Sequence, residues 1–159
     1  MALETIGKYQ LVRPLGGGGF GEVYLARDPD IERDIAIKIF KPKDENLIAF
    51  ATSSSEEGMQ KLQERFLAEA KILASLEHEP YIINIIEFGR LEDGAPWYAM
   101  PYLPHSLRDL LGQDVFDKRA LEELPEAEQP KSLPFNQALA LLEQILQGMA
   151  AAHRKGLAH

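Results

Sequence analysis

The residues best suited to chemistry begin with a dense run of glycines, Leu15-Gly16-Gly17-Gly18-Gly19-Phe20-Gly21-Glu22-Val23. Gly16, Gly18 and Gly21 fit the spacing G-x-G-x-x-G, and Val23 extends it to G-x-G-x-x-G-x-V. Glycine loses more backbone freedom on folding than any other residue, so this density favours a tight turn or a close approach of the backbone to another group. The free N–H groups of such a loop can cover phosphates, and its apolar ends can cover a base. The alternative is a glycine loop that binds nothing.

The flanks of the glycines decide which kind of loop this is. The runs 9–13 and 23–27 are rich in β-branched and aromatic residues, and Asp28-Pro29-Asp30 ends the second run. A dinucleotide-binding turn leads from a strand into a helix. The sequence instead predicts a hairpin of two strands with the glycines at its tip.

Two charged residues further along the chain are candidate partners of this hairpin. The run 34–40 alternates as a strand, with Ile35, Ile37 and Ile39 on one face and Ala36, Lys38 and Phe40 on the other. Lys38 is either an edge lysine that reaches water or a cation aimed at an anionic ligand under the glycines. Glu69 borders the apolar stripe of a helix that ends near Leu76. It is either a surface residue or the partner of Lys38 across the helix–sheet interface.

The remaining elements complete an α+β arrangement. The helix stripe comprises Met59, Leu62, Phe66, Ala70 and Leu73, and Ser53 and Ser54 with Glu56 and Glu57 give capping-box signals for its start. A buried strand over 82–88, an Asp93-Gly94 hairpin turn and a strand over 97–100 follow. The expected fold is a five-stranded antiparallel sheet with one helix on a face.

Beyond the proline-bracketed connector 101–104, the chain is expected to be helical. A capping box at Ser106 and Asp109 opens a short helix through Leu111, and 112–133 is interpreted as a surface insertion. A long helix begins at Pro134 and ends near Lys155. Its face carries Leu141, Leu142, Ile145, Met149 and Ala152. So large an apolar surface predicts either self-association through this helix or a loosely packed C-terminal third.

Composition limits the classes of function. The chain has 159 residues, a net charge of −8, 45% hydrophobic residues and no cysteine. The acidic balance argues against a nucleic-acid partner, since no cluster of Lys and Arg is present to neutralise phosphates. We expect no disulfide, no membrane segment in this chain and no metal site among the histidines.

In this order and spacing, the motifs resemble the first half of a protein kinase of the bacterial (Hanks-type) serine/threonine class. The run 15–23 is similar to the glycine-rich loop of that family, and Ile35-Ala36-Ile37-Lys38 to its V-A-I-K motif. The run 65–70 resembles the segment that holds the glutamate of helix αC. The run 151–159 resembles the end of helix αE leading into the catalytic loop. The resemblance covers nearly the whole chain, apart from 41–55 and 112–133.

The resemblance implies a role for each matching residue. The backbone N–H groups of Gly16, Gly17, Gly18, Gly19, Phe20 and Gly21 would cover the phosphates of ATP, and Leu15, Val23 and Ala36 would form the upper wall of the adenine pocket. Glu22 is also counted among the nucleotide-binding residues. Lys38 would contact the α- and β-phosphates and pair with Glu69. Met100 would lie behind the adenine, while Pro101 and Leu103 would offer backbone hydrogen bonds from the hinge.

The resemblance also implies a division and an incompleteness. Residues 1–100 would be the kinase N-lobe, 101–105 the hinge and 106–159 the beginning of the C-lobe. His159 falls where the H-R-D motif begins, so the catalytic Asp and the residues that hold Mg²⁺ are not in this sequence. We therefore expect the chain alone to be inactive in phosphoryl transfer and to act on a protein substrate only in a complete kinase. The resemblance also implies a location in the cytoplasm or at the cytoplasmic face of the membrane. The alternative is a non-catalytic module that binds a nucleotide or a partner.

Overall fold

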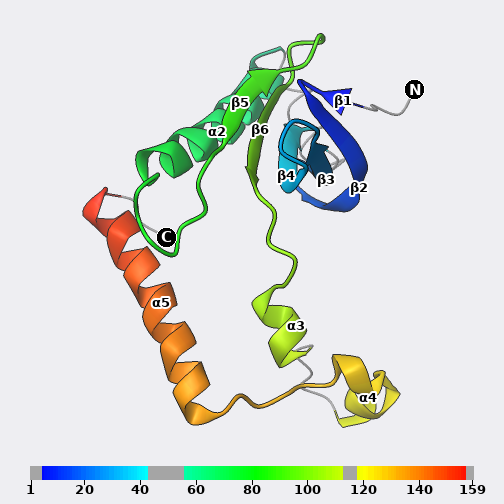
Figure 1. Ribbon diagram of the computed structural model, residues 1–159, viewed down its shortest axis with the longest axis vertical. Coiled ribbons are helices and arrows are strands. Elements are labelled where there is room, and N and C mark those ends of the chain that lie inside the picture. The colour runs from blue at the N-terminus through cyan, green and yellow to red at the C-terminus, as the bar shows by residue number, and fades with distance from the viewer. Residues whose placement is uncertain (1–4, 43–55, 113–117, 157–159) are drawn as a thin grey trace. The chain divides into compact units, whose positions relative to one another are not determined.

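A six-stranded antiparallel sheet dominates the first of two compact units, Met1–Tyr102; the second unit is Leu103–His159. The computed structural model describes residues 5–42, 56–112 and 118–156. The strands are β1 (Thr5–Ile6), β2 (Tyr9–Gly18), β3 (Gly21–Asp28), β4 (Arg33–Phe40), β5 (Glu87–Arg90) and β6 (Pro96–Pro101). They lie in the order β1-β2-β3-β4-β6-β5 (Figure 1).

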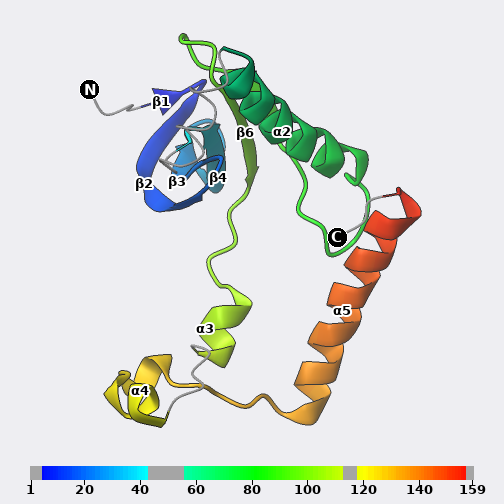
Figure 2. The ribbon, with the colours of Figure 1, turned by 180° about the vertical axis from the view of Figure 1, so that it is seen from behind.

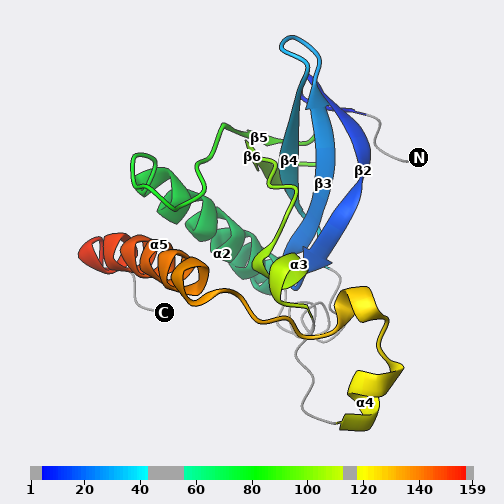
Figure 3. The ribbon, with the colours of Figure 1, turned by 60° about the horizontal axis from the view of Figure 1, so that its bottom comes forward.

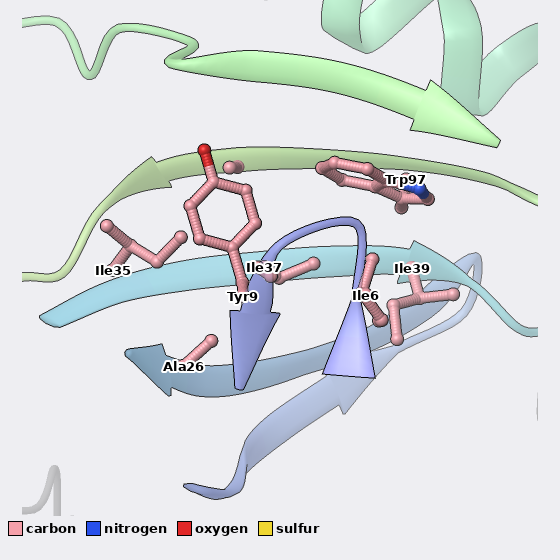
Figure 4. Packing of buried hydrophobic residues seen from close by; sticks show 8 residues of the cluster. Ile6, Tyr9, Ala26, Ile35, Ile37, Ile39 and Trp97 are labelled. Carbon is pink, nitrogen blue, oxygen red and sulfur yellow. The ribbon is translucent and has the colours of Figure 1, made fainter. Parts of the chain in front are cut away.

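Strand β4 divides the core of this unit into two clusters because its side chains alternate between the faces of the sheet. Ile35, Ile37 and Ile39 point to one face, where they join Ile6, Tyr9, Ala26, Trp97 and Ala99 in what we call the isoleucine cluster (Figure 4). The predicted alternation of this strand is confirmed. β1 adds to the expected sheet, because Ile6 is buried in this cluster and brings the residues before Gly7 into pairing with β2.

The opposite face of the sheet is covered by helix α2 (Glu56–Ser75), which runs beside β5 and β6 (Figures 1 and 2). The buried members of this layer, the phenylalanine cluster, are Phe40, Leu62, Phe66, Ala70 and Tyr98. Met59 and Leu73 pack against them, so the predicted helix stripe is confirmed. The serines of the predicted capping box, Ser53 and Ser54, lie outside the described residues.

The predicted strand over 82–88 is wrong at its start. β5 begins at Glu87, and residues 82–86 are neither a strand nor fully buried. The turn around Gly94, which has φ +85°, fixes the pairing from Arg90 with Pro96 to Glu87 with Ala99. The pairing of β5 with β6 ends at Glu87 and Ala99, whereas β6 continues to Pro101 and pairs there with β4.

The second unit is helical in its described part. It contains α3 (Leu107–Leu111), α4 (Lys118–Glu123), the 3-10 turn η1 (Glu126–Glu128) and α5 (Phe135–Arg154). Figure 3 shows the three α-helices. The capping box of Ser106 and Asp109 is confirmed at the start of α3. α4 and η1 lie within the stretch predicted as a surface insertion, and residues 113–117 are outside the description.

Candidate functional site

The glycine run forms the tip of the β2–β3 hairpin, as predicted. Gly16 pairs with Val23, Gly17 with Glu22 and Gly18 with Gly21, which leaves Gly19 and Phe20 as the turn. Gly21 is required by its surroundings, because a Cβ atom there would overlap the backbone carbonyl of Ile39 on β4. A Cβ at Gly18 would meet nothing within 4 Å. The part of the hairpin on β3, which we call the β3 arm, is therefore packed tightly against β4. The part on β2, the β2 arm, has free space around Gly18.

Sheet register places a row of side chains beneath this hairpin. Val23 of β3 pairs with Lys38 of β4, and Lys38 pairs with Tyr98 of β6. Directly paired residues of antiparallel strands point to the same face, so these three side chains share one face. A cavity of about 340 Å³ opens here, lined by Leu15, Gly16, Gly17, Gly18, Gly19, Phe20, Gly21, Val23 and Lys38.

Lys38 and Glu69 meet across the interface of sheet and helix. The Nζ atom of Lys38 lies 2.6 Å from Oε1 and 2.9 Å from Oε2 of Glu69. The side chains are 20% and 42% exposed, so the pair is neither fully buried nor free in water. Glu69 reaches the pair because α2 packs its apolar stripe on the sheet. Phe66, three residues before Glu69 and 0% exposed, fixes the rotation of the helix.

Tyr98 is a member of the site that the sequence analysis missed. Its hydroxyl donates a hydrogen bond to Oε1 of Glu69 at 2.7 Å. Burial, and then this bond to an anion, raise the pKa of the phenol well above its ordinary value, so it remains a donor. The alternation of β6 could have indicated this position of Tyr98. Residues two apart in a strand share a face, so Tyr98 lies on the same face as Met100.

Aromatic rings surround the ammonium group of Lys38. Its Nζ atom lies 5.8 Å from the ring centroid of Phe66 and 5.9 Å from that of Tyr98. These distances suit cation–π attraction. Lys38 is thus fixed by a carboxylate and two rings while it lines the glycine cavity, so a second anion entering the cavity would find a positioned cation.

The other predicted site residues fall into three groups. Ala36 pairs with Met100 across β4 and β6, so both lie on the same face as Lys38, whereas Pro101 pairs with Ile35 at the end of β6. Glu22 does not line the cavity. Its carboxylate instead accepts hydrogen bonds from Tyr24 and Lys41. Leu103 belongs to the second unit, where it is 66% exposed.

The described ranges 5–42, 56–112 and 118–156 contain no group of three or more acidic, histidine or cysteine side chains placed to hold a metal ion. Within the same ranges, no helix is both long and apolar enough to cross a membrane.

A family profile and individual relatives both relate this chain to protein kinases. The profile of the family described as "Protein kinase domain" matches residues 9–159. The chain is 35% identical to the serine/threonine-protein kinase pkn2 of Myxococcus xanthus over 158 residues, which cover 99% of this chain and 15% of that protein. It is 37% identical over 155 residues to the serine/threonine-protein kinase PknD of Chlamydia trachomatis, covering 96% of this chain and 14% of the relative.

A solved structure of a bacterial kinase domain is also similar to this chain. The crystal structure of a double mutant of the PknI kinase domain from Mycobacterium tuberculosis is 28% identical and superposes with a TM-score of 0.57. The match covers 100% of this chain and 55% of that domain. The chain thus spans about a seventh of the curated relatives named above and about half of a solved domain of the same fold.

Proposed function

Because the chain belongs to the protein kinase domain family, we propose that its first unit binds ATP as part of a serine/threonine protein kinase. In the reaction of that class, the γ-phosphate of ATP is transferred to a serine or threonine hydroxyl of a protein substrate. The single observation that carries this proposal is the Lys38–Glu69 ion pair, with contacts of 2.6 and 2.9 Å, beside the glycine cavity.

The charges and shape of the cavity support a triphosphate as the ligand. The glycine backbone on one wall leaves room close to the peptide groups, since Gly16 and Gly18 have open space where a Cβ atom would lie. Lys38 supplies a cation whose position is held from behind by Glu69. In the proposal, Lys38 binds the α- and β-phosphates, Glu69 orients Lys38, and Leu15, Val23, Ala36 and Met100 contact the base.

Two backbone segments complete the proposed nucleotide site. The carbonyl of Pro101 and the N–H and carbonyl of Leu103 would bind the adenine edge from a hinge over 101–105, between an N-lobe of 1–100 and the start of a C-lobe at 106–159. Mg²⁺ would accompany ATP, where it neutralises phosphate charge. We assign no Mg²⁺ ligand within the sequence. The proposal places the protein in the cytoplasm, where ATP is available to it.

Titration of the purified 159-residue chain with ATP and Mg²⁺, followed by calorimetry, tests the binding. We expect saturable binding that weakens by about 10- to 100-fold in Lys38→Met, because a hydrogen bond to a charged group contributes about 1.5–3 kcal/mol. Lys61→Met is the matched control, since Lys61 is an exposed lysine of α2. Absence of binding, or equal affinity in the two variants, would contradict the proposal.

We further propose that this polypeptide binds ATP without transferring phosphate measurably. Phosphoryl transfer depends on positioning and on neutralising charge, and the H-R-D aspartate and the metal-binding residues of the family motifs are not found in the sequence. Incubation with radiolabelled ATP and a general protein substrate checks this. Substrate labelling that persists after repeated purification and is lost in Lys38→Met would overturn it.

The apolar face of α5 is the basis for a proposed contact with a second copy of the chain. Leu139, Leu142, Ile145 and Leu146 are about half exposed, at 52%, 51%, 47% and 54%. Burying such side chains in a dimer would remove apolar area from water. Analytical ultracentrifugation should show an association that Ile145→Glu weakens and Gln144→Glu, on the same helix, does not. A wild-type chain that stays monomeric at high concentration would contradict this contact.

A further inference from the structure

Lys41, just beyond the end of β4, contacts the glycine hairpin twice. Its backbone N–H donates a hydrogen bond to the carbonyl of Phe20 at 3.3 Å. Its side-chain Nζ atom lies 2.8 Å from Oε2 of Glu22. Because Phe20 and Glu22 flank Gly21, the two contacts hold the chain on both sides of the glycine that packs against β4.

The carboxylate of Glu22 connects this contact to the core. The Glu22 side chain is 10% exposed, and its Oε2 also accepts a hydrogen bond from the hydroxyl of Tyr24 at 2.7 Å. The Tyr24 side chain packs against the isoleucine cluster. A buried carboxylate is costly unless it is paired, so Glu22 binds its partners strongly. The hydrogen bond to Glu22 correspondingly raises the pKa of Lys41.

The two arms of the hairpin are held unequally. On the β3 arm, Gly21 and Glu22 are buried and tied to Lys41. On the β2 arm, Gly16, Gly17 and Gly18 are exposed, and the pairing shifts register between Pro14 and Gly16. Movement of the hairpin should therefore be concentrated in the β2 arm, with the β3 arm as its fixed support.

We propose that Lys41 is a positioning residue for the glycine hairpin, acting through the carbonyl of Phe20 and the carboxylate of Glu22. This inference rests on the proposed function, in which the hairpin covers the phosphates of ATP. Lys41 does not line the cavity itself, and its ammonium group is occupied by Glu22. It favours ATP binding by keeping the backbone of the β3 arm in place, because the hairpin then loses less conformational entropy when ATP binds.

The test uses Lys41→Met, which keeps the backbone N–H and removes the charge. Two quantities are measured in the whole chain: amide hydrogen exchange across 16–23 without nucleotide, and the dissociation constant for ATP with Mg²⁺. We expect exchange to accelerate by about threefold to tenfold, and ATP affinity to fall by a similar factor. Lys41→Arg should restore both, because a guanidinium group can also bind the Glu22 carboxylate.

Lys8→Met is the matched control, because it removes the two ion pairs of Lys8, with Asp28 and Asp30, elsewhere in the same unit. The Nζ atom of Lys8 lies 3.1 Å from Asp28 at the opposite end of β3 from Glu22. It should change the stability of the sheet and leave exchange across 16–23 unchanged. Equal effects of the two variants on that exchange, or no effect of Lys41→Met, would overturn the inference. If the chain binds no ATP, the proposed function fails, while the exchange experiment still decides whether Lys41 holds the hairpin.

Discussion

The hydroxyl of Tyr98 donates a hydrogen bond to Oε1 of Glu69, the same oxygen that lies 2.6 Å from Nζ of Lys38. One carboxylate oxygen thus receives a donor from β6 and a donor from β4. Since Glu69 is carried by α2, this oxygen is the point at which the helix is tied to two neighbouring strands. The tie positions Lys38 at the wall of the glycine cavity.

Removing the Tyr98 hydroxyl should loosen this arrangement without emptying the core. Tyr98→Phe keeps the ring, so we expect a loss of about 1 kcal/mol in the free energy of unfolding, typical of one hydrogen bond. Urea unfolding followed by fluorescence measures it, because Trp97 is the single tryptophan and lies in the isoleucine cluster. Tyr81→Phe, at a tyrosine 57% exposed, is the control. When Tyr98→Phe is made in the Glu69→Gln variant, the loss in the free energy of unfolding should be smaller. An equal loss in both backgrounds would show that the two side chains are not coupled.

The glycines of the hairpin should differ sharply in their tolerance of alanine. In Gly21→Ala the new methyl group meets the backbone carbonyl of Ile39, so β3 must shift, and we expect a loss of about 1–3 kcal/mol or more. Gly18→Ala places its methyl group in open space and should change the stability by less than about 0.5 kcal/mol. Paired denaturation curves compare them. A Gly21→Ala protein as stable as Gly18→Ala would be inconsistent with the tight packing of β3 on β4.

Phe66 should contribute more to stability than other phenylalanines because it is enclosed between helix and sheet. It is 0% exposed, and its ring lies 5.8 Å from that of Phe40 and 5.3 Å from that of Tyr98. We expect Phe66→Ala to cost about 3–5 kcal/mol, by lost burial and a residual cavity. Phe135→Ala, at a residue 77% exposed, should leave the Trp97 transition unchanged. A small loss in Phe66→Ala would mean that α2 is held on the sheet by other contacts.

Alkaline pH should destabilise the sheet through its buried phenols. Burial, and then a 2.5 Å hydrogen bond to Glu87, raise the pKa of Tyr9 from 10.0 to about 12. A phenol that ionises later in the folded state than in the unfolded state contributes stability below about pH 10, and that contribution is lost as pH rises toward 12. Unfolding midpoints measured from pH 9 to 12 should therefore fall. They should fall less steeply in Tyr9→Phe than in Tyr81→Phe, and identical slopes would argue against a buried Tyr9 phenol.

Much of this architecture could be predicted because local patterns determine it. The alternation of Ile35, Ile37 and Ile39 assigned the faces of β4, and the stripe through Phe66 and Ala70 set the buried side of α2. These two assignments already aimed Lys38 and Glu69 at one interface. The residue patterns alone were also compatible with Glu69 on the surface. The observed distance of 2.6 Å between Nζ of Lys38 and Oε1 of Glu69 depends on how α2 packs on the sheet.

The features that escaped prediction depend on pairing between distant strands. Tyr98 reaches Glu69 because β6 lies next to β4 in a register that no local pattern specifies. Thr5 and Ile6 form a strand because β2 offers an edge, although two residues carry too weak a signal alone. The run of isoleucines before Glu87 resembles a buried strand, yet the pairing with β6 ends at Glu87 and Ala99.

The pleat of β4 also restricts how this gene can change in length. Deleting one codon between Ile35 and Lys38 would turn the ammonium group onto the side of Tyr9 and Trp97 and send isoleucine toward Glu69. Deleting two would restore the faces and shift the strand by one full repeat of its pleat. Insertions and deletions should therefore accumulate in turns such as 29–32, and an odd change within β4 should abolish the amine–carboxylate contact.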